Sequence, residues 1–206
     1  MDVERVLAIL EARHDRLEEM LAQLAWPLPG HLASKWLDDV AQRFLAGEAT
    51  AEQVEGAFLR NYQAHGIQDI RRSWEADHQI AARLPILMDA LHAHDEQRYN
   101  LSVPVILAQL EGMVAAAKAH AGRFTAKTLV AYLKPIVTGG SRFERIAAKL
   151  VVTTLWTEFE HGGTTPPLSR HAILHGADTA YGTGANSLKA ILFLDTIGAA
   201  LSKSAA

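Results

Sequence analysis

The spacing of apolar residues constrains this fold more than any other feature of the sequence. Apolar side chains recur at three- and four-residue steps along most of the chain, and the first helix is expected where they fall at Val3, Val6, Leu7, Leu10, Leu17, Met20, Leu21 and Leu24. Steps of this size place the side chains on one face of an α-helix. The alternation that is typical of β-strands is scarce. We therefore predict an all-α protein, a helical bundle with an N-terminal helical extension.

Proline, glycine and capping residues divide the chain into the helices of this bundle. Thr50, with Gln53 three positions later, is typical of a capping box, and Ser141 is a plausible cap for a later helix. The expected helices span 2–24, about 31–46, 51–74 with fraying near residues 65 and 66, 77–94 with a kink or a start near Leu84, 99–121, 124–137, 141–160, a short helix between Ser169 and Gly176, and a last helix from Asn186 or Ser187 to about Leu201.

Composition narrows the class of protein. Hydrophobic residues make up 49% of the 206 residues and charged residues 21%, which is ordinary for a globular protein. The chain has no cysteine, which excludes disulfides, thiolate metal sites and cysteine nucleophiles. The charged N-terminus does not resemble a signal peptide, and the longest apolar run, Ala190 to Leu201, is interrupted by Asp195. We expect a cytoplasmic protein that does not enter a membrane.

Charge is divided unevenly along the chain. Residues 1–100 carry 10 Lys and Arg and 17 Asp and Glu, a net −7, whereas residues 101–206 carry 10 and 6, a net +4. A polyanion is better tolerated by the second half than by the first. We divide the chain accordingly into an acidic N-terminal helical region, residues 1–76, and a helical bundle, residues 77–206.

One stretch near the C-terminus combines residue types that handle phosphate. Arg170 can fork onto phosphate oxygens, and His175, five positions later, can exchange a proton near neutral pH. The spacing alone is not specific, because a histidine four to six intervening residues after an arginine occurs four times among the 13 arginines and 10 histidines. This copy differs in its position, since it follows the glycine- and proline-rich loop 161–167 inside the basic half.

The string Arg170-His171-x3-His175 resembles the signature of the HEPN superfamily, in which arginine is followed by a polar residue and then by histidine. The wider text from Leu168 to Gly176, with Tyr181-Gly182-Thr183 and Asn186-Ser187-Leu188-Lys189, is similar to uncharacterised bacterial proteins in or near that superfamily, as is an upstream block from Arg83 to Gly112. The resemblance covers about residues 83–195. Residues 1–80 match no family that we can name.

The resemblance implies a helical bundle that forms a homodimer, with two copies of the motif facing across a cleft. Active members are metal-independent endoribonucleases, many of them toxins or phage-defence effectors, and others bind nucleotides or partners. It implies Arg170 as a phosphate clamp, His175 as general acid and base, and His171 as the orienting position. The implied partners are RNA and an antitoxin or other regulatory protein, and no cofactor is implied. The alternative is a non-catalytic helical module that binds a nucleotide or a protein.

Three further residues are candidates for the site. Glu111 lies in an apolar stretch, where a carboxylate is rarely buried without a partner, so it forms a salt bridge, lies at a helix edge, or orients Arg170 or a histidine. Tyr181 can stack on a base or pack a loop. Asn186 can cap a helix or contact a ligand.

A metal site is a third interpretation of the same stretch. His171 and His175 have the spacing of the two zinc ligands on a helix, but Ala172 stands where such enzymes carry a glutamate base. A third ligand, such as Glu111 or His161, would be required. We therefore predict no metal.

Overall fold

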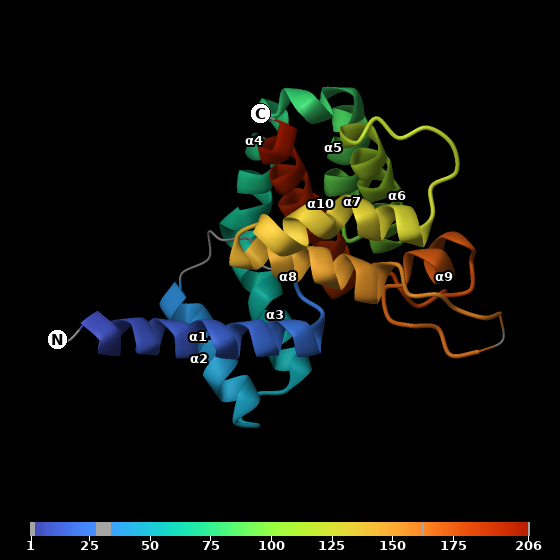
Figure 1. Cartoon of the computed structure of the whole chain (residues 1–206). Coiled ribbons are helices and arrows are strands. Elements are labelled where there is room, and N and C mark those ends of the chain that lie inside the picture. Colours follow the sequence, from blue (N-terminus) through green and yellow to red (C-terminus); the bar gives the residue numbers. More distant parts are fainter. Residues whose placement is uncertain (1–2, 28–33, 162, 206) are drawn as a thin grey trace.

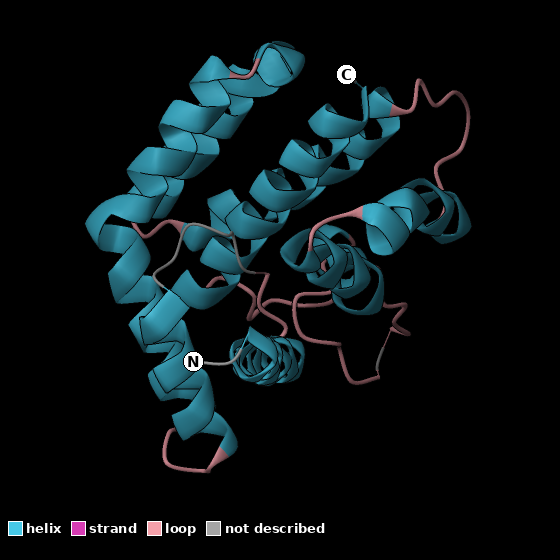
Figure 2. Ribbon diagram, turned by 60° about the vertical axis from the view of Figure 1, so that its left-hand side comes forward, coloured by secondary structure: helices cyan, strands magenta, loops and turns pink. Residues whose placement is uncertain are grey.

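The computed structural model describes residues 3–27, 34–161 and 163–205, and within them it contains helices and no strand (Figures 1 and 2). The predicted all-α helical bundle is confirmed. The α-helices are α1 (Val3–Leu24), α2 (Ser34–Leu45), α3 (Ala51–Asn61), α4 (Ile67–Ala76), α5 (Leu84–Asp95), α6 (Tyr99–Ala117), α7 (Ala126–Gly139), α8 (Arg142–Leu150), α9 (Arg170–Leu174) and α10 (Gly184–Ala205). Short turns of other helix types lie at η1 (Tyr62–Gly66), η2 (His78–Arg83) and η3 (Val151–Leu155).

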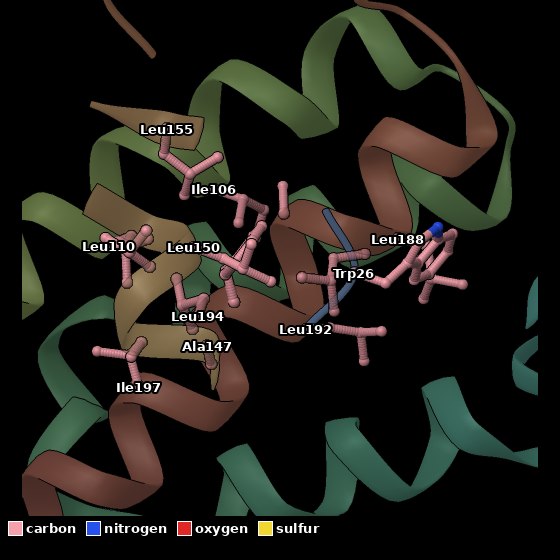
Figure 3. Packing of buried hydrophobic residues seen from close by; sticks show 14 of the residues in the cluster. Trp26, Ile106, Leu110, Ala147, Leu150, Leu155, Leu188, Leu192, Leu194 and Ile197 are labelled. Carbon is pink, nitrogen blue, oxygen red and sulfur yellow. The ribbon is translucent and has the colours of Figure 1, made fainter. Parts of the chain in front are cut away.

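The core is built around α6 and α10, which pack along each other, with α5 and α8 against them. Figure 3 shows side chains of α6, α8 and α10 meeting with Leu155 and Trp26. Trp26 precedes residue 76 in the sequence and yet belongs to the same buried cluster as Leu188 and Leu192 of α10. The N-terminal helices and the rest of the described chain therefore share one core.

Helix α6 is long and apolar enough to cross a membrane by length and composition. In that respect the expectation that no stretch qualifies, with Ala190–Leu201 as the longest candidate, is wrong. Six apolar residues of α6 are buried among the other helices, namely Val103, Ile106, Leu107, Leu110, Met113 and Val114, whereas Leu101 is 48% exposed. Burial in the core thus accounts for the apolar residues on one part of α6.

Ion pairs join the acidic and the basic halves of the chain. Arg142 of α8 pairs with Asp15 and Glu18 of α1. Lys189 of α10 pairs with Glu55 of α3 at 2.6 Å, and it also donates to the Leu24 carbonyl oxygen at 2.9 Å. Folding thus neutralises part of the positive charge that the sequence concentrates after residue 100.

Several helix ends agree with the sequence. Thr50 and Gln53 form the predicted capping box of α3, and Ser141 with Glu144 forms another at α8. Helix α5 begins at Leu84, one residue before Pro85, which occupies the first turn where no backbone N–H is needed. The expected start of the second helix near residue 31 lies outside the described residues.

Several predicted helix ends are wrong: α6, for example, ends at Ala117 and not at residue 121. The expected fraying near residue 65 is instead the π-helical turn η1, where Tyr62 is buried in the core. The last helix begins at Gly184, because Thr183 Oγ1 accepts from the backbone N–H of Asn186 at 3.1 Å and so caps it. The helix from Ser141 ends with η3 at Leu155, not at residue 160.

Candidate functional site

Helix α9 is a short helix at the edge of the bundle, beside the chain that follows η3 (Figure 1). Its cap, Ser169, is fully buried and makes two hydrogen bonds: Oγ accepts from the Ala172 N–H at 3.3 Å and donates to the Thr157 carbonyl oxygen at 2.8 Å. The carbonyl of Thr157 is therefore used by Ser169 and not by a continuing helix. Gly176, with φ of +75°, ends α9.

Arg170 links α9 to the core helix α6. Its Nη2 atom lies 2.6 Å from Glu111 Oε2, and its guanidinium carbon lies 5.4 Å from the centre of the Trp156 ring. The two charged side chains are 16% and 26% exposed, so the pair is shielded but reachable from solvent. The Nε atom of Arg170 is buried without a hydrogen-bond partner among the described residues. Of the alternatives that the sequence leaves open for Glu111, the structure shows a salt bridge to Arg170.

The two histidines of α9 lie side by side, as their spacing predicts. Their ring centroids are 6.2 Å apart and their planes differ by 7°. His175 is exposed and His171 is half-buried. Burial lowers the pKa of His171 below its usual value, the positive charges of Arg170 and His175 lower it further, and Glu111 and Glu158 act in the opposite direction. His171 is therefore neutral at neutral pH.

Aromatic residues that sequence reasoning missed complete this cluster. Trp156 lies under Arg170, and the Phe159 ring centroid lies 5.0 Å from that of His161 and 6.4 Å from that of His175. A helix continuing to residue 160 would carry Phe159 along its axis, whereas the observed chain leaves the helix after Leu155. Trp156 and Phe159 lie in the segment between two helices, and helical periodicity could not identify them as part of the site.

Two predicted site residues lie elsewhere. The Tyr181 hydroxyl donates to the Asn100 carbonyl oxygen at 3.2 Å, and the Asn186 side-chain amide donates to the Tyr181 carbonyl oxygen at 3.0 Å. Asn100 and Glu111 are both on α6, eleven residues apart, which corresponds to roughly 16 Å at the helical rise per residue. The structure brings Arg170, His171, His175 and Glu111 together, and it does not bring Tyr181 or Asn186 to them.

The donors around α9 do not form a metal cage. Over residues 3–27, 34–161 and 163–205, no three histidine, aspartate or glutamate side chains are grouped so that they could hold a metal ion. The third ligand that a zinc site would need is therefore not in place beside His171 and His175.

Comparison of the chain with models of protein families, with curated proteins and with solved structures finds no match. A functional proposal for this chain therefore rests on the chemistry of the residues gathered at α9. Those residues supply one guanidinium, two imidazoles and a carboxylate that holds the guanidinium in place. This set can bind an anion and exchange protons.

Proposed function

We propose that the chain is a metal-independent endoribonuclease of the HEPN type whose reacting groups are carried by α9. The observation that supports this most is the cluster itself: Arg170 is held in place by Glu111, and the imidazole of His171 on α9 lies parallel to that of His175, which follows the last residue of α9. RNA carries its own nucleophile in the 2′-hydroxyl, so an enzyme needs mainly to move two protons and to stabilise the charged phosphate.

The proposed reaction conserves every atom of the RNA. A base removes the 2′-hydroxyl proton, the 2′-oxygen bonds to the adjacent phosphorus, and the bond from phosphorus to the 5′-oxygen breaks. An acid then protonates the departing 5′-oxygen, which leaves a cyclic phosphate and a 5′-hydroxyl. His175 is exposed and suited to proton exchange with the substrate. The resemblance implies that His171 orients it, and the neutral ring of His171 is also suited to accept the first proton.

Arg170 is proposed to stabilise the negative charge that builds on the phosphate. Glu111 Oε2 lies 2.6 Å from Nη2, and a guanidinium carries five N–H groups, so others can donate to a phosphate oxygen. Glu111 offsets the charge of Arg170 when no substrate is bound. This arrangement fixes the direction of the guanidinium before the substrate arrives, which favours catalysis.

Purified protein incubated with total RNA in EDTA tests the proposal. The wild type is expected to cleave RNA without a divalent metal, and the double variant Arg170→Ala/His175→Ala is expected to lose this activity. Arg72→Ala/His92→Ala is the matched control, because it removes an exposed arginine and an exposed histidine from α4 and α5. Equal cleavage by the wild type and the α9 double variant would contradict the proposal.

The wider setting is part of the same proposal. We infer a cytoplasmic homodimer whose partner copy brings a second α9 to the site, acting as a toxin or phage-defence effector under control of an antitoxin or another regulatory protein. Light scattering measures the oligomeric state, and growth on induced expression measures toxicity. Expression that slows growth only with Arg170 and His175 intact is the expected outcome.

A non-catalytic binding module is the second candidate. It is favoured by the same contact that holds Arg170, since a guanidinium paired with Glu111 and lying on Trp156 is also what a structural link between α9 and α6 requires. On this alternative the Arg170→Ala/His175→Ala variant keeps its fold and loses dimerisation or nucleotide binding, and neither protein cleaves RNA. A variant that still dimerises and binds like the wild type would exclude it.

A further inference from the structure

Three rings, those of Phe159, His161 and His175, lie close together at the end of α9. The Phe159 ring is near both His161 and His175, with centroid distances of 5.0 Å and 6.4 Å and interplanar angles of 76° and 34°. His175 in turn lies parallel to His171. The rings come from two separate segments, the chain after η3 and the end of α9, and the hydrogen bond from Ser169 to Thr157 holds these segments together two residues before Phe159.

Core packing does not explain the position of Phe159. Within the described residues, it is not one of the partly buried apolar side chains that pack against the core cluster, whereas Tyr181 is one of them. Among the described residues, the ring of Phe159 contacts the imidazoles of His161 and His175, and both of these histidines are exposed. A half-buried aromatic ring beside two exposed imidazoles can present its π-surface to a ligand, and it contributes little to the packing of the core.

Electrostatics alone would bind a polyanion weakly at this place. Glu111 offsets Arg170, and Glu158 is close enough to act on His171. Elsewhere, Arg142 and Lys189 are paired with carboxylates of the N-terminal helices. Binding that relies on few free cations releases few counterions and depends weakly on salt. An oligonucleotide held here must gain its affinity from another contact, and stacking of bases on rings is such a contact.

We propose that Phe159, His161 and His175 form a stacking platform for an unpaired base beside the phosphate held at Arg170, so that this site selects single-stranded RNA. The inference rests on the proposed nuclease function and specifies its substrate. In a duplex each base is already stacked between its neighbours, and its faces cannot reach the platform. An unpaired nucleotide can place its base on the rings while its phosphate lies toward Arg170 and its 2′-hydroxyl toward the histidines.

Binding is measured with a fluorescent 2′-O-methyl oligoribonucleotide, which keeps its bases and phosphates but lacks the nucleophile and cannot be cleaved. Fluorescence anisotropy in EDTA gives the Kd for the single strand, for its duplex and for the same strand with abasic positions. The wild type is expected to bind the single strand at least tenfold more tightly than the duplex or the abasic strand. Affinity for the single strand should fall only slightly between 50 and 200 mM salt.

Phe159→Leu is the test variant, because it keeps an apolar side chain and removes the ring. It is expected to weaken single-strand binding roughly 5- to 100-fold, the range measured for one lost stacking contact, and to leave duplex binding unchanged. Phe124→Leu is the matched control, since Phe124 also packs edge-on against a histidine, His120, with centroids 5.3 Å apart, but lies before α7. Circular dichroism with thermal unfolding establishes that both variants are folded.

The outcomes separate the platform from the nuclease. Single-strand binding that depends on Phe159 without any RNA cleavage by the wild type supports the platform and overturns the proposed nuclease. RNA cleavage by the wild type, with equal single-strand affinity for wild type and Phe159→Leu, overturns the platform and leaves the nuclease standing. Equal affinity for single strand and duplex, or no binding to either, also overturns the platform.

Discussion

At the scale of single residues, the pair formed by Arg170 and Glu111 determines what the candidate site can do. A guanidinium that is mostly buried would be costly without a counter-charge, and Glu111 supplies it from the neighbouring core helix. The same carboxylate would be left without its counter-charge if Arg170 were removed. Glu111 is therefore coupled to Arg170 in stability as well as in the proposed chemistry.

A double-mutant cycle measures this coupling. Urea unfolding of Arg170→Ala, Glu111→Ala and the double variant is expected to yield a coupling energy of about 1 kcal/mol, because the pair is partly exposed and screened by solvent. The exposed pair of Arg72 and Asp69 is the control and should yield less than about 0.5 kcal/mol. A coupling energy no larger than that of the control would show that the contact has no energetic weight.

The ionisation of His171 is a second test at this scale. Burial and the charges of Arg170 and His175 lower its pKa below the usual 6.5, while Glu111 raises it. Glu111→Gln removes the opposing negative charge and leaves Arg170, so the pKa of His171 should fall further. NMR titration of the ring proton measures both values. His94, whose pKa is lowered mainly by burial, is the internal control and should not respond to Glu111→Gln. A His171 pKa at or above 6.5 would contradict the geometry described for the site.

At the scale of helices and loops, one residue joins the two segments of the site. The Ser169 hydroxyl accepts from the Ala172 N–H and donates to the Thr157 carbonyl oxygen. It therefore positions both α9 and the segment that carries Phe159. Ser141 is a comparable cap that acts on α8 alone, through its capping box with Glu144.

Ser169→Ala is expected to lower the free energy of unfolding by about 2–3 kcal/mol, because it removes a cap and leaves a carbonyl without its donor. Ser141→Ala should cost about 1 kcal/mol. Chemical denaturation measures both values. The comparison fails if the two variants lose the same amount, since the bond from Ser169 to Thr157 would then contribute nothing.

The sequence predicts helices where periodicity and caps agree, and it fails where tertiary contacts set the end of a helix. Thr50 and Ser141 act through neighbours three residues away, so a local pattern identifies them. The chain after η3 is held by Ser169, which bonds to Thr157 from twelve residues later, and by Trp156, which is buried. Glu111 could be noticed as a carboxylate in an apolar helix, whereas Phe159 could not, because its neighbours are close only after folding.

At the scale of the whole molecule, charge that is separated in the sequence is brought together in the fold. Lys189 of α10 contacts Glu55, the Leu24 carbonyl and, at 5.1 Å, the ring of Trp26. These three partners come from the N-terminal part of the chain. Lys189 therefore links the N-terminal part of the chain to the core helix α10.

Lys189→Met keeps much of the side-chain volume and removes the charge, so it should lower the free energy of unfolding by about 2–4 kcal/mol by leaving Glu55 without its cation. Adding Glu55→Met should recover part of the loss, because both charges are then removed. Lys203→Met, at an exposed lysine paired with Glu144, should cost less than about 1 kcal/mol. Urea unfolding measures these free energies. Equal losses of stability for Lys189→Met and Lys203→Met would contradict the role of Lys189 in linking the N-terminal part of the chain to α10.

The bond between Ser169 and Thr157 has a practical consequence for protein engineering. It closes the loop of residues 158–168 at its base, so the length of that loop does not set the position of α9. Doubling such a loop costs only about 0.6 kcal/mol in closure entropy. A peptide tag or a fluorescent reporter inserted between Gly163 and Thr164, both exposed, should leave the histidines of α9 in register while reporting from a position beside them.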